Sequence, residues 1–237
     1  MSLGGPATES NRRSDRTVQS PVQEGWQGDP LGHSASRSTS KRILDIIVSL
    51  AAIIFFGPLM VVIAITIKIF DPGPVLFSHQ RIGRNGESFG CLKFRTMSCD
   101  AERRLAKLLD SSEAARREWH ELHKLSIDPR VTPLGGFLRA SSLDELPQFF
   151  NVLRGDMSIV GPRPIVEEER PRYGRFIHSY CSVKPGLTGL WQVSGRNQVS
   201  YRRRVATDVF YCRNGDLGLD LWIMIRTPVV MIKGTGQ

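Results

Sequence analysis

The chain has 237 residues, of which 41% are hydrophobic and 23% charged, so it is long enough for one folded domain with appended segments. Its 32 Lys and Arg residues exceed its 23 Asp and Glu residues, and the net charge of +9 predicts an anionic partner: a membrane surface, nucleic acid or a phosphorylated small molecule. The four cysteines are scattered and form no C-x-x-C pair, which argues against a zinc site or disulfide framework and favours a reducing, cytosolic location.

The first 40 residues form a polar segment, rich in Ser, Gly, Pro, Gln and Arg and poor in apolar side chains other than Trp26. Such a segment cannot bury enough apolar surface to offset its conformational entropy, so we predict a disordered tail over residues 1–40. It lacks an apolar stretch after a short basic start, so we expect no signal peptide.

A long apolar run occupies residues 43–70. A helix rises about 1.5 Å per residue, so the centre of the run, residues 46–67, reaches roughly 33 Å, enough for a hydrocarbon core of about 30 Å. We therefore predict a membrane segment over residues 41–70, followed by a cytosolic domain over residues 71–237.

Gly57 and Pro58 divide this run near its middle. Proline in a helix loses a backbone hydrogen bond, and neither half alone is long enough to cross a bilayer. Two forms follow: a kinked helix that spans the membrane, or a re-entrant helix-break-helix that enters and leaves on one side. Basic residues flank both ends, with Lys41 and Arg42 expected at the membrane interface. This favours the re-entrant form, because a spanning helix carries its Lys/Arg excess on one side.

Short strands and an amphipathic helix are predicted after the membrane segment. Residues 75–78 and 89–94 have strand character on either side of a turn at residues 83–86. Residues 101–124 carry leucines and a tryptophan on one helical side and many charges on the other. Such a helix lies either on the protein surface in water or on the bilayer, with its arginines near lipid phosphates.

Further helices are predicted in the C-terminal half, around a chain break at residues 133–136 and a Gly-rich loop at residues 184–189. The predicted fold is therefore α+β and mostly helical: a small cytosolic domain with surface amphipathic helices and one re-entrant membrane helix-break-helix. The helical ranges are 144–153, 165–180 and 201–212, and residues 217–231 form another apolar segment.

Asp144 and Glu145 form an adjacent carboxylate pair at the start of a predicted helix. One interpretation is helix capping, since Ser142 and Glu145 fit an S-x-x-E capping box, although Pro147 would then forfeit a hydrogen bond at the fifth helical residue. The other is a functional site. An ionised Asp can attack phosphorus, and a neighbouring Glu can hold Mg²⁺, which prefers one or two carboxylates plus substrate phosphates. The residue pattern leaves both interpretations open.

Basic side chains near this pair are candidates for binding phosphate. Pro162 and Pro164 flank Arg163 and keep its backbone extended, and arginine makes bidentate contacts to phosphate. Lys93 and Arg95 are two residues apart, so on a strand both point to one face. Each group also has an ordinary interpretation, as an exposed arginine in a turn or as charges on an edge strand.

Taken in order, the motifs resemble those of the bacterial sugar transferases, the monotopic polyprenyl-phosphate phosphoglycosyl transferases. The resemblance covers about residues 41–233. The motifs are Lys41-Arg42-x-x-Asp45, the apolar run with its proline, Asp71-Pro72-Gly73-Pro74-Val75, Lys93-Phe94-Arg95-Thr96-Met97, Leu143-Asp144-Glu145-Leu146-Pro147-Gln148, Gly155-Asp156-Met157-Ser158, Val160-Gly161-Pro162-Arg163-Pro164, Lys184-Pro185-Gly186-Leu187-Thr188-Gly189 and Asp208-x-x-Tyr211.

The resemblance implies a reaction at the acidic pair. Asp144 would attack the β-phosphate of a UDP-sugar, release UMP and carry the phosphosugar until undecaprenyl phosphate takes it, while Glu145 would bind Mg²⁺. Larger members carry extra spans and a further domain, so this chain is expected to be the short form that initiates exopolysaccharide synthesis. It would act on the cytoplasmic face of a bacterial inner membrane, with galactose or glucose as the expected sugar.

The expected partners are the UDP-sugar, undecaprenyl phosphate and membrane lipid. Nucleic acid is not expected, because aromatic–basic platforms are missing from the sequence. A monomer and a homo-oligomer both stay open, and the alternative function is a non-catalytic membrane scaffold that binds anionic lipid or proteins. The expected substrate-binding residues are Lys93, Arg95, Thr96, Arg139, Pro162, Arg163, Pro164, Arg196 and Asp208.

Overall fold

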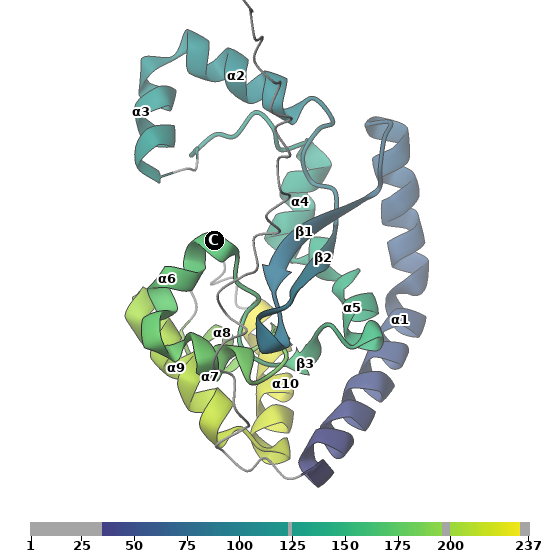
Figure 1. The fold of residues 1–237 in the computed structure, drawn as a ribbon. Coiled ribbons are helices and arrows are strands. Elements are labelled where there is room, and N and C mark those ends of the chain that lie inside the picture. Colours follow the sequence, from purple (N-terminus) through teal and green to yellow (C-terminus); the bar gives the residue numbers. More distant parts are fainter. Residues whose placement is uncertain (1–34, 123–124, 196–199, 233–237) are drawn as a thin grey trace, which may run out of the picture. The chain divides into compact units, whose positions relative to one another are not determined.

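The computed structural model describes residues 35–122, 125–195 and 200–232. Within these ranges the chain is mostly helical and contains two small two-stranded sheets (Figure 1), which confirms the predicted mostly helical α+β class. The disorder predicted for residues 1–34 lies outside the described residues. Residues 35–40 are helical, so the predicted tail extends six positions too far.

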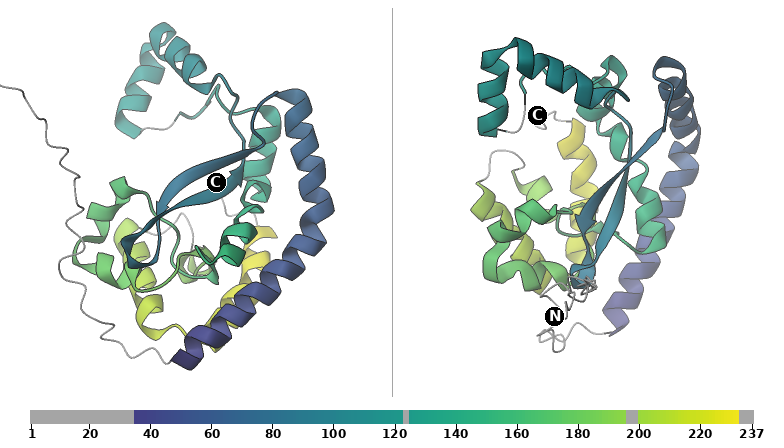
Figure 2. Two further views of the ribbon diagram at one scale, coloured as in Figure 1. Left: turned by 45° about the vertical axis from the view of Figure 1, so that its right-hand side comes forward. Right: turned by 45° about the horizontal axis from the view of Figure 1, so that its top comes forward.

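Helix α1 (Ala35–Phe70) contains the predicted membrane segment and ends where the sequence predicts. Among the described residues it is the one helix long and apolar enough to cross a membrane, and only 11% of its most apolar window is buried in the protein. Gly57 and Pro58 are helical, which corrects the expected break: the helix is continuous, and its axis changes direction partway along (Figures 1 and 2). Re-entry on one side of a membrane stays a prediction.

The N-terminal half of α1 is fastened to the domain by ionic and polar contacts. Lys41 Nζ lies 2.7 Å from Oδ2 of Asp220 in α10 (Leu217–Ile232). Arg42 donates to the carbonyl oxygens of Val152 and Leu153, each at 2.6 Å. The structure thus engages both cations with protein groups. A buried carboxylate and the carbonyls at a helix C-terminus need such donors, and contact of Lys41 or Arg42 with lipid stays a prediction.

The predicted hairpin is confirmed. Strand β1 (Leu76–Ile82) pairs antiparallel with β2 (Ser88–Phe94) around a 3-10 turn, η1 (Arg84–Gly86). Asn85 turns the chain with a φ of 60°. The first strand is longer than predicted, because its exposed polar residues pair with β2 although they lack strand-like apolar alternation.

Two segments fold differently from the sequence prediction. The single helix expected over residues 101–124 is two helices, α2 (Ala101–Ser111) and α3 (Glu113–Leu122), because Ser112 is extended with a φ of −134° and a ψ of 112°. The helix expected over residues 165–180 is divided into four short helical segments: η3 (Glu167–Glu169), α6 (Arg170–Tyr173), η4 (Gly174–Phe176) and α7 (Ile177–Cys181). Gly174, with a φ of 48°, leaves the right-handed helical region there.

The chain break expected at residues 133–136 is instead the start of helix α4 (Pro133–Ser141). Proline at the first helical position costs no hydrogen bond, and the Thr132 side chain caps the helix by accepting from the Gly135 amide at 2.9 Å. The acidic turn η2 (Leu143–Glu145) and helix α5 (Gln148–Arg154) follow.

The remaining elements close the domain. Strand β3 (Ser158–Val160) pairs in parallel with β4 (Gly186–Thr188), which lies within the predicted Gly-rich loop. Asp45 of α1 is buried and accepts from Ser158 Oγ and the Ile159 amide, both at 2.9 Å. The last helices, α8 (Leu190–Ser194), α9 (Tyr201–Asn214) and α10, agree with the predicted helix at residues 201–212 and the apolar segment that follows it.

The C-terminal half of α1 packs directly beneath the acidic turn. Ile63 and Ile67 share one hydrophobic cluster with Phe94 of β2, Leu138 of α4 and Leu146, which follows η2. Helix α1 therefore forms part of the core that supports residues 143–145.

Candidate active site

The acidic turn η2 carries Asp144 and Glu145 between α4 and α5. Ser142 ends α4 in a left-handed conformation with a φ of 58°, and its side chain makes no capping hydrogen bond. The capping-box interpretation is therefore wrong. Pro147 precedes α5, so its missing N–H leaves no helical hydrogen bond unmade.

Lys93 joins the two carboxylates. Its ammonium lies 2.7 Å from Glu145 Oε1 and 3.4 Å from Asp144 Oδ2. The Asp144 side chain is 8% exposed and the Glu145 side chain 30%, so the first is enclosed by protein while the second reaches the surface. The two acids therefore have different environments although they are adjacent in sequence.

The pKa shifts of the two acids reflect this difference. Burial raises the pKa of Asp144, against the lowering effect of Lys93, and the nearby Glu145 charge raises it further. Burial also acts to raise the pKa of Glu145, but Lys93, Arg163 and Arg81 outweigh it and the net pKa is lowered. Glu145 is thus held ionised by surrounding cations, whereas Asp144 is a poorly solvated carboxylate beside a single ammonium.

Asn151, which the sequence reasoning missed, fixes Lys93 opposite the acidic turn. It is fully buried in α5. Its Oδ1 accepts from the Leu92 amide at 2.9 Å, and its Nδ2 donates to the Gly90 carbonyl at 2.8 Å and to Asp156 Oδ2 at 3.0 Å. These bonds hold β2 against α5. The sequence signal was a lone amide among the apolar residues of a predicted helix.

A pocket opens beside Glu145 where the hairpin, the acidic turn, the Pro-Arg-Pro turn, β4 and α8 meet. Its wall is mainly cationic and polar. The lining residues are Arg81, Cys91, Lys93, Glu145, Gln148, Arg163, Pro164, Gly186, Leu187 and Gln192. The structure thus brings Lys93, Glu145, Arg163 and Pro164 together as the sequence predicts, and adds Arg81 and Gln192.

The Pro-Arg-Pro turn is held by its backbone, which leaves the Arg163 side chain free to face the pocket. The Pro162 carbonyl accepts from the Gly186 amide at 2.8 Å, and the Pro164 carbonyl accepts from Arg81 Nη1 at 3.4 Å. This rigid support agrees with the proline-restricted turn expected from the sequence.

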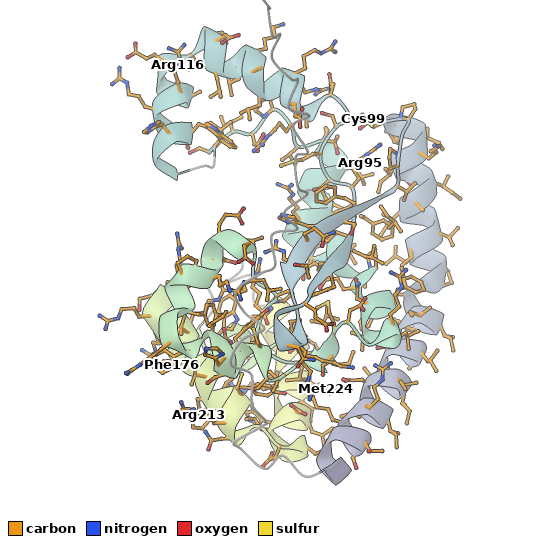
Figure 3. All side chains as sticks on the ribbon, in the orientation of Figure 1. Arg95, Cys99, Arg116, Phe176, Arg213 and Met224 are labelled. Atoms are coloured by element: carbon orange, nitrogen blue, oxygen red, sulfur yellow. The ribbon has the colours of Figure 1, made fainter. Side chains whose placement is uncertain are left out.

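Other predicted substrate-binding residues lie elsewhere in the structure. The Arg95 guanidinium pairs with Asp71, 3.3 Å from its Oδ2, and contacts Cys99 beside the C-terminal end of α1 (Figure 3). The expectation that Lys93 and Arg95 point to one face of a strand is therefore wrong, because β2 ends at Phe94, while substrate contact by Arg95 stays a prediction. Arg139 donates from Nε to Thr96 Oγ1 at 2.9 Å. Substrate contact by Thr96 and by Arg139 stays a prediction. Arg196 lies outside the described residues.

Asp208 is buried in α9 and accepts from the Tyr173 hydroxyl at 2.7 Å. Burial raises its pKa to about 7, against the opposing effects of the Tyr173 hydrogen bond, Arg204 and Arg163. Its side chain faces tyrosine rather than the lining of the Glu145 pocket, so direct substrate contact by Asp208 stays a prediction.

The acidic turn can offer a metal ion two adjacent carboxylates. Within the described ranges no group of three or more His, Cys, Asp or Glu residues could hold an ion by itself. Asp144 and Glu145 nevertheless fit Mg²⁺, which commonly binds through one or two carboxylates and completes its coordination with water and substrate phosphates. Glu145, the more exposed acid on the pocket wall, would be the better placed of the two to bind the ion.

Comparison with known proteins shows the family to which the chain belongs. The model of the family described as "Bacterial sugar transferase" matches residues 36–234. The "Exopolysaccharide production protein ExoY" of Sinorhizobium fredii is 48% identical over 226 residues, which cover 95% of this chain and 98% of that protein.

Two further relatives have names that describe a reaction. The "Undecaprenyl-phosphate galactose phosphotransferase" of Salmonella typhimurium is 47% identical over 83% of this chain, which spans only 41% of that longer protein. The "UDP-glucose:undecaprenyl-phosphate glucose-1-phosphate transferase" of Caulobacter vibrioides is 40% identical over 84% of this chain and 72% of its own length.

Proposed function

Because the chain belongs to the bacterial sugar transferase family, we propose that it is a phosphoglycosyl transferase that moves a sugar 1-phosphate from a UDP-sugar to undecaprenyl phosphate. This step would start exopolysaccharide synthesis, in keeping with the name of the Sinorhizobium fredii relative. The observation that carries the proposal is the buried Asp144 carboxylate, joined through Lys93 to Glu145 on the wall of a cationic pocket.

The reaction has two displacements at one phosphorus atom. A carboxylate oxygen of Asp144 bonds to the β-phosphorus, and the bond from this phosphorus to the bridging oxygen breaks, so that the electron pair leaves with UMP. A phosphate oxygen of undecaprenyl phosphate then bonds to the same phosphorus and the Asp144–phosphorus bond breaks. The product is a sugar linked to the lipid by a diphosphate, and Asp144 is again a free carboxylate.

The surrounding side chains support this chemistry electrostatically. The β-phosphate carries negative charge, so an anionic nucleophile approaches it only where cations reduce the repulsion. Lys93 and Arg163 are the cations we assign to this task, because both line the pocket with Glu145. Mg²⁺, held by Glu145 and substrate phosphates, would supply further charge neutralisation when bound.

We place the catalytic domain at the cytoplasmic face of a bacterial inner membrane. Support comes from the apolar, largely unburied α1 and from its packing beneath the acidic turn through Ile63 and Ile67. With α1 in the bilayer, the acidic pair would lie near the membrane surface, where a soluble sugar nucleotide and a lipid phosphate can both arrive. Galactose and glucose are the sugars to test first, since they appear in the names of the relatives.

The decisive experiment measures UMP release from a panel of UDP-sugars by full-length protein in lipid nanodiscs with undecaprenyl phosphate. We expect release with UDP-galactose or UDP-glucose and a matching lipid product by mass spectrometry. Asp144→Asn should abolish both, whereas the control Asp110→Asn, an exposed acid on α2, should not change the rate. Wild-type activity in Asp144→Asn would refute the assignment of Asp144 as the nucleophile. A wild-type protein that releases no UMP would favour the membrane-scaffold alternative.

A separate experiment addresses the covalent intermediate. Wild-type protein is incubated with a UDP-sugar radiolabelled in the sugar, in the absence of undecaprenyl phosphate, and should retain the label after denaturation. If undecaprenyl phosphate is added after labelling and before denaturation, the protein should lose the label. Asp144→Asn should retain none. Equal labelling of wild type and variant would place the covalent bond on another residue, and the absence of label with normal turnover would favour direct transfer.

A further inference from the structure

Arg81 of β1 lines the Glu145 pocket, but it forms no ion pair with Asp144 or Glu145, which both pair with Lys93 instead. Among the side chains that the structure describes, neither Arg81 nor Arg163 forms an ion pair with a carboxylate. The hydrogen bonds of Arg81 go to two neutral acceptors, the Pro164 carbonyl at 3.4 Å and His79 Nδ1 at 3.1 Å. Arg81 is therefore a cation with spare donor capacity at the pocket.

The hairpin register directs Arg81 toward the site. Arg81 pairs with Phe89 and Phe77 pairs with Lys93, so Arg81 and Lys93 stand on the same face of the two-stranded sheet. Lys93 reaches the acidic pair from this face. The same face therefore presents a second cation farther along the hairpin, on the side of the Pro-Arg-Pro turn.

The charges on the pocket wall are unbalanced. Arg81, Lys93 and Arg163 provide three cations, whereas Glu145 provides the one carboxylate among the lining residues. Burial, together with repulsion from Arg163, lowers the pKa of Arg81. An anion placed between the two guanidinium groups would relieve this repulsion, and a diphosphate has both the charge and the spread of oxygen atoms that two arginines can bind.

We propose that Arg81 is a binding residue for the diphosphate of the sugar nucleotide and acts together with Arg163. The inference rests on the proposed function, because it takes the UDP-sugar as the ligand. It differs from a purely structural role, in which Arg81 would only hold the Pro164 carbonyl. The 3.4 Å length of that bond makes it a weak constraint, and it uses only one of the five N–H donors of the guanidinium.

The test compares equilibrium binding of UDP and uridine to full-length protein in nanodiscs. Arg81→Gln should weaken UDP binding by about tenfold or more, the loss expected for a charge-assisted hydrogen bond, and should leave uridine affinity unchanged. Arg81→Lys should retain part of the UDP affinity, because it keeps the charge but loses the planar fork. The matched control is Arg84→Gln, an exposed arginine on the neighbouring turn, which should bind both ligands like wild type.

Two results would overturn the assignment. One is UDP affinity in Arg81→Gln equal to that of wild type, and the other is an equal loss of UDP and uridine affinity in Arg81→Gln and Arg81→Lys, as a structural role predicts. The proposed function fails separately, if wild-type protein releases no UMP from any UDP-sugar. If wild type releases UMP and Arg81→Gln does so with an unchanged KM, the Arg81 inference alone fails.

Discussion

Lys93 pairs with Glu145 at 2.7 Å across a sequence separation of 52 residues. The same ammonium lies 3.4 Å from Asp144, so a single cation from the hairpin contacts both acids of the turn. This relationship makes the charge state of the proposed nucleophile depend on a residue outside its own motif.

We therefore predict that Lys93→Met shifts the acid limb of the pH–rate profile to higher pH. Lys93 lowers the pKa of Asp144 against the raising effect of burial, so its removal raises that pKa and protonates the nucleophile at pH values where wild type is ionised. The measurement is kcat/KM for UMP release across the acid range. Lys107→Met, an exposed lysine on α2, serves as the control. An acid limb that stays in place or moves to lower pH would contradict the assignment.

Asn151→Ala should reduce both stability and activity. It leaves the Leu92 amide and the Gly90 carbonyl without their side-chain partner, which costs about 1–3 kcal/mol for buried polar groups. Thermal unfolding in nanodiscs and the rate of UMP release measure the two effects. Asn214→Ala is the matched control, since Asn214 is exposed at the end of α9 and its bond to Phe210 is local. Equal melting temperatures for the two variants would show that Asn151 does not hold the hairpin in place.

Asp208→Asn should change how stability depends on pH. The pKa of Asp208 is raised from 3.8 to about 7 in the folded protein, so the folded state retains a proton that the unfolded state loses between these values. Wild type therefore loses stability as pH rises from about 4 to 7, and the asparagine variant lacks this loss. The melting temperatures of both proteins are measured at pH 5 and pH 8. The melting temperature of the variant relative to that of wild type should be higher at pH 8 than at pH 5. A constant difference between the two proteins would show that Asp208 does not titrate in this range.

Leu138→Ala should lower the free energy of unfolding by about 2–5 kcal/mol, as expected for a fully buried leucine beneath the acidic turn. Leu138 is 0% exposed and packs with Ile63 and Ile67 of α1. Its neighbour Phe137 is 62% exposed on the same helix, so Phe137→Ala should change stability little. Denaturant unfolding in detergent measures both variants. Similar unfolding midpoints would mean that the cluster beneath the turn contributes little.

The topology of α1 can be tested by labelling. In a protein without its four natural cysteines, Ser20→Cys and Glu102→Cys place one thiol before and one after the helix. The re-entrant form predicts that a membrane-impermeant maleimide labels neither thiol from outside spheroplasts and labels both after lysis. Labelling of the first thiol alone in intact spheroplasts would establish a spanning helix instead.

Local sequence patterns predicted several elements correctly. The apolar run predicted α1, because a continuous stretch of large apolar side chains has few alternatives to a membrane helix. The turn at residues 83–86 and its flanking segments predicted the hairpin. The errors arose where a local signal has two meanings: Pro133 begins α4 rather than ending a segment, and Pro58 lies inside α1 without interrupting it.

In the candidate site, too, the sequence determined some features and the tertiary structure decided others. The sequence by itself determined the family, the acidic pair and the Pro-Arg-Pro turn, because these motifs are contiguous and their chemistry depends on residue type. Only the tertiary structure decided which cations face the pair. Lys93 reaches it whereas Arg95 turns to Asp71, and Asn151 and Arg81 gain their places through contacts with distant segments. The physical reason is that a side chain's partner is set by packing between elements, and spacing along one strand cannot specify it.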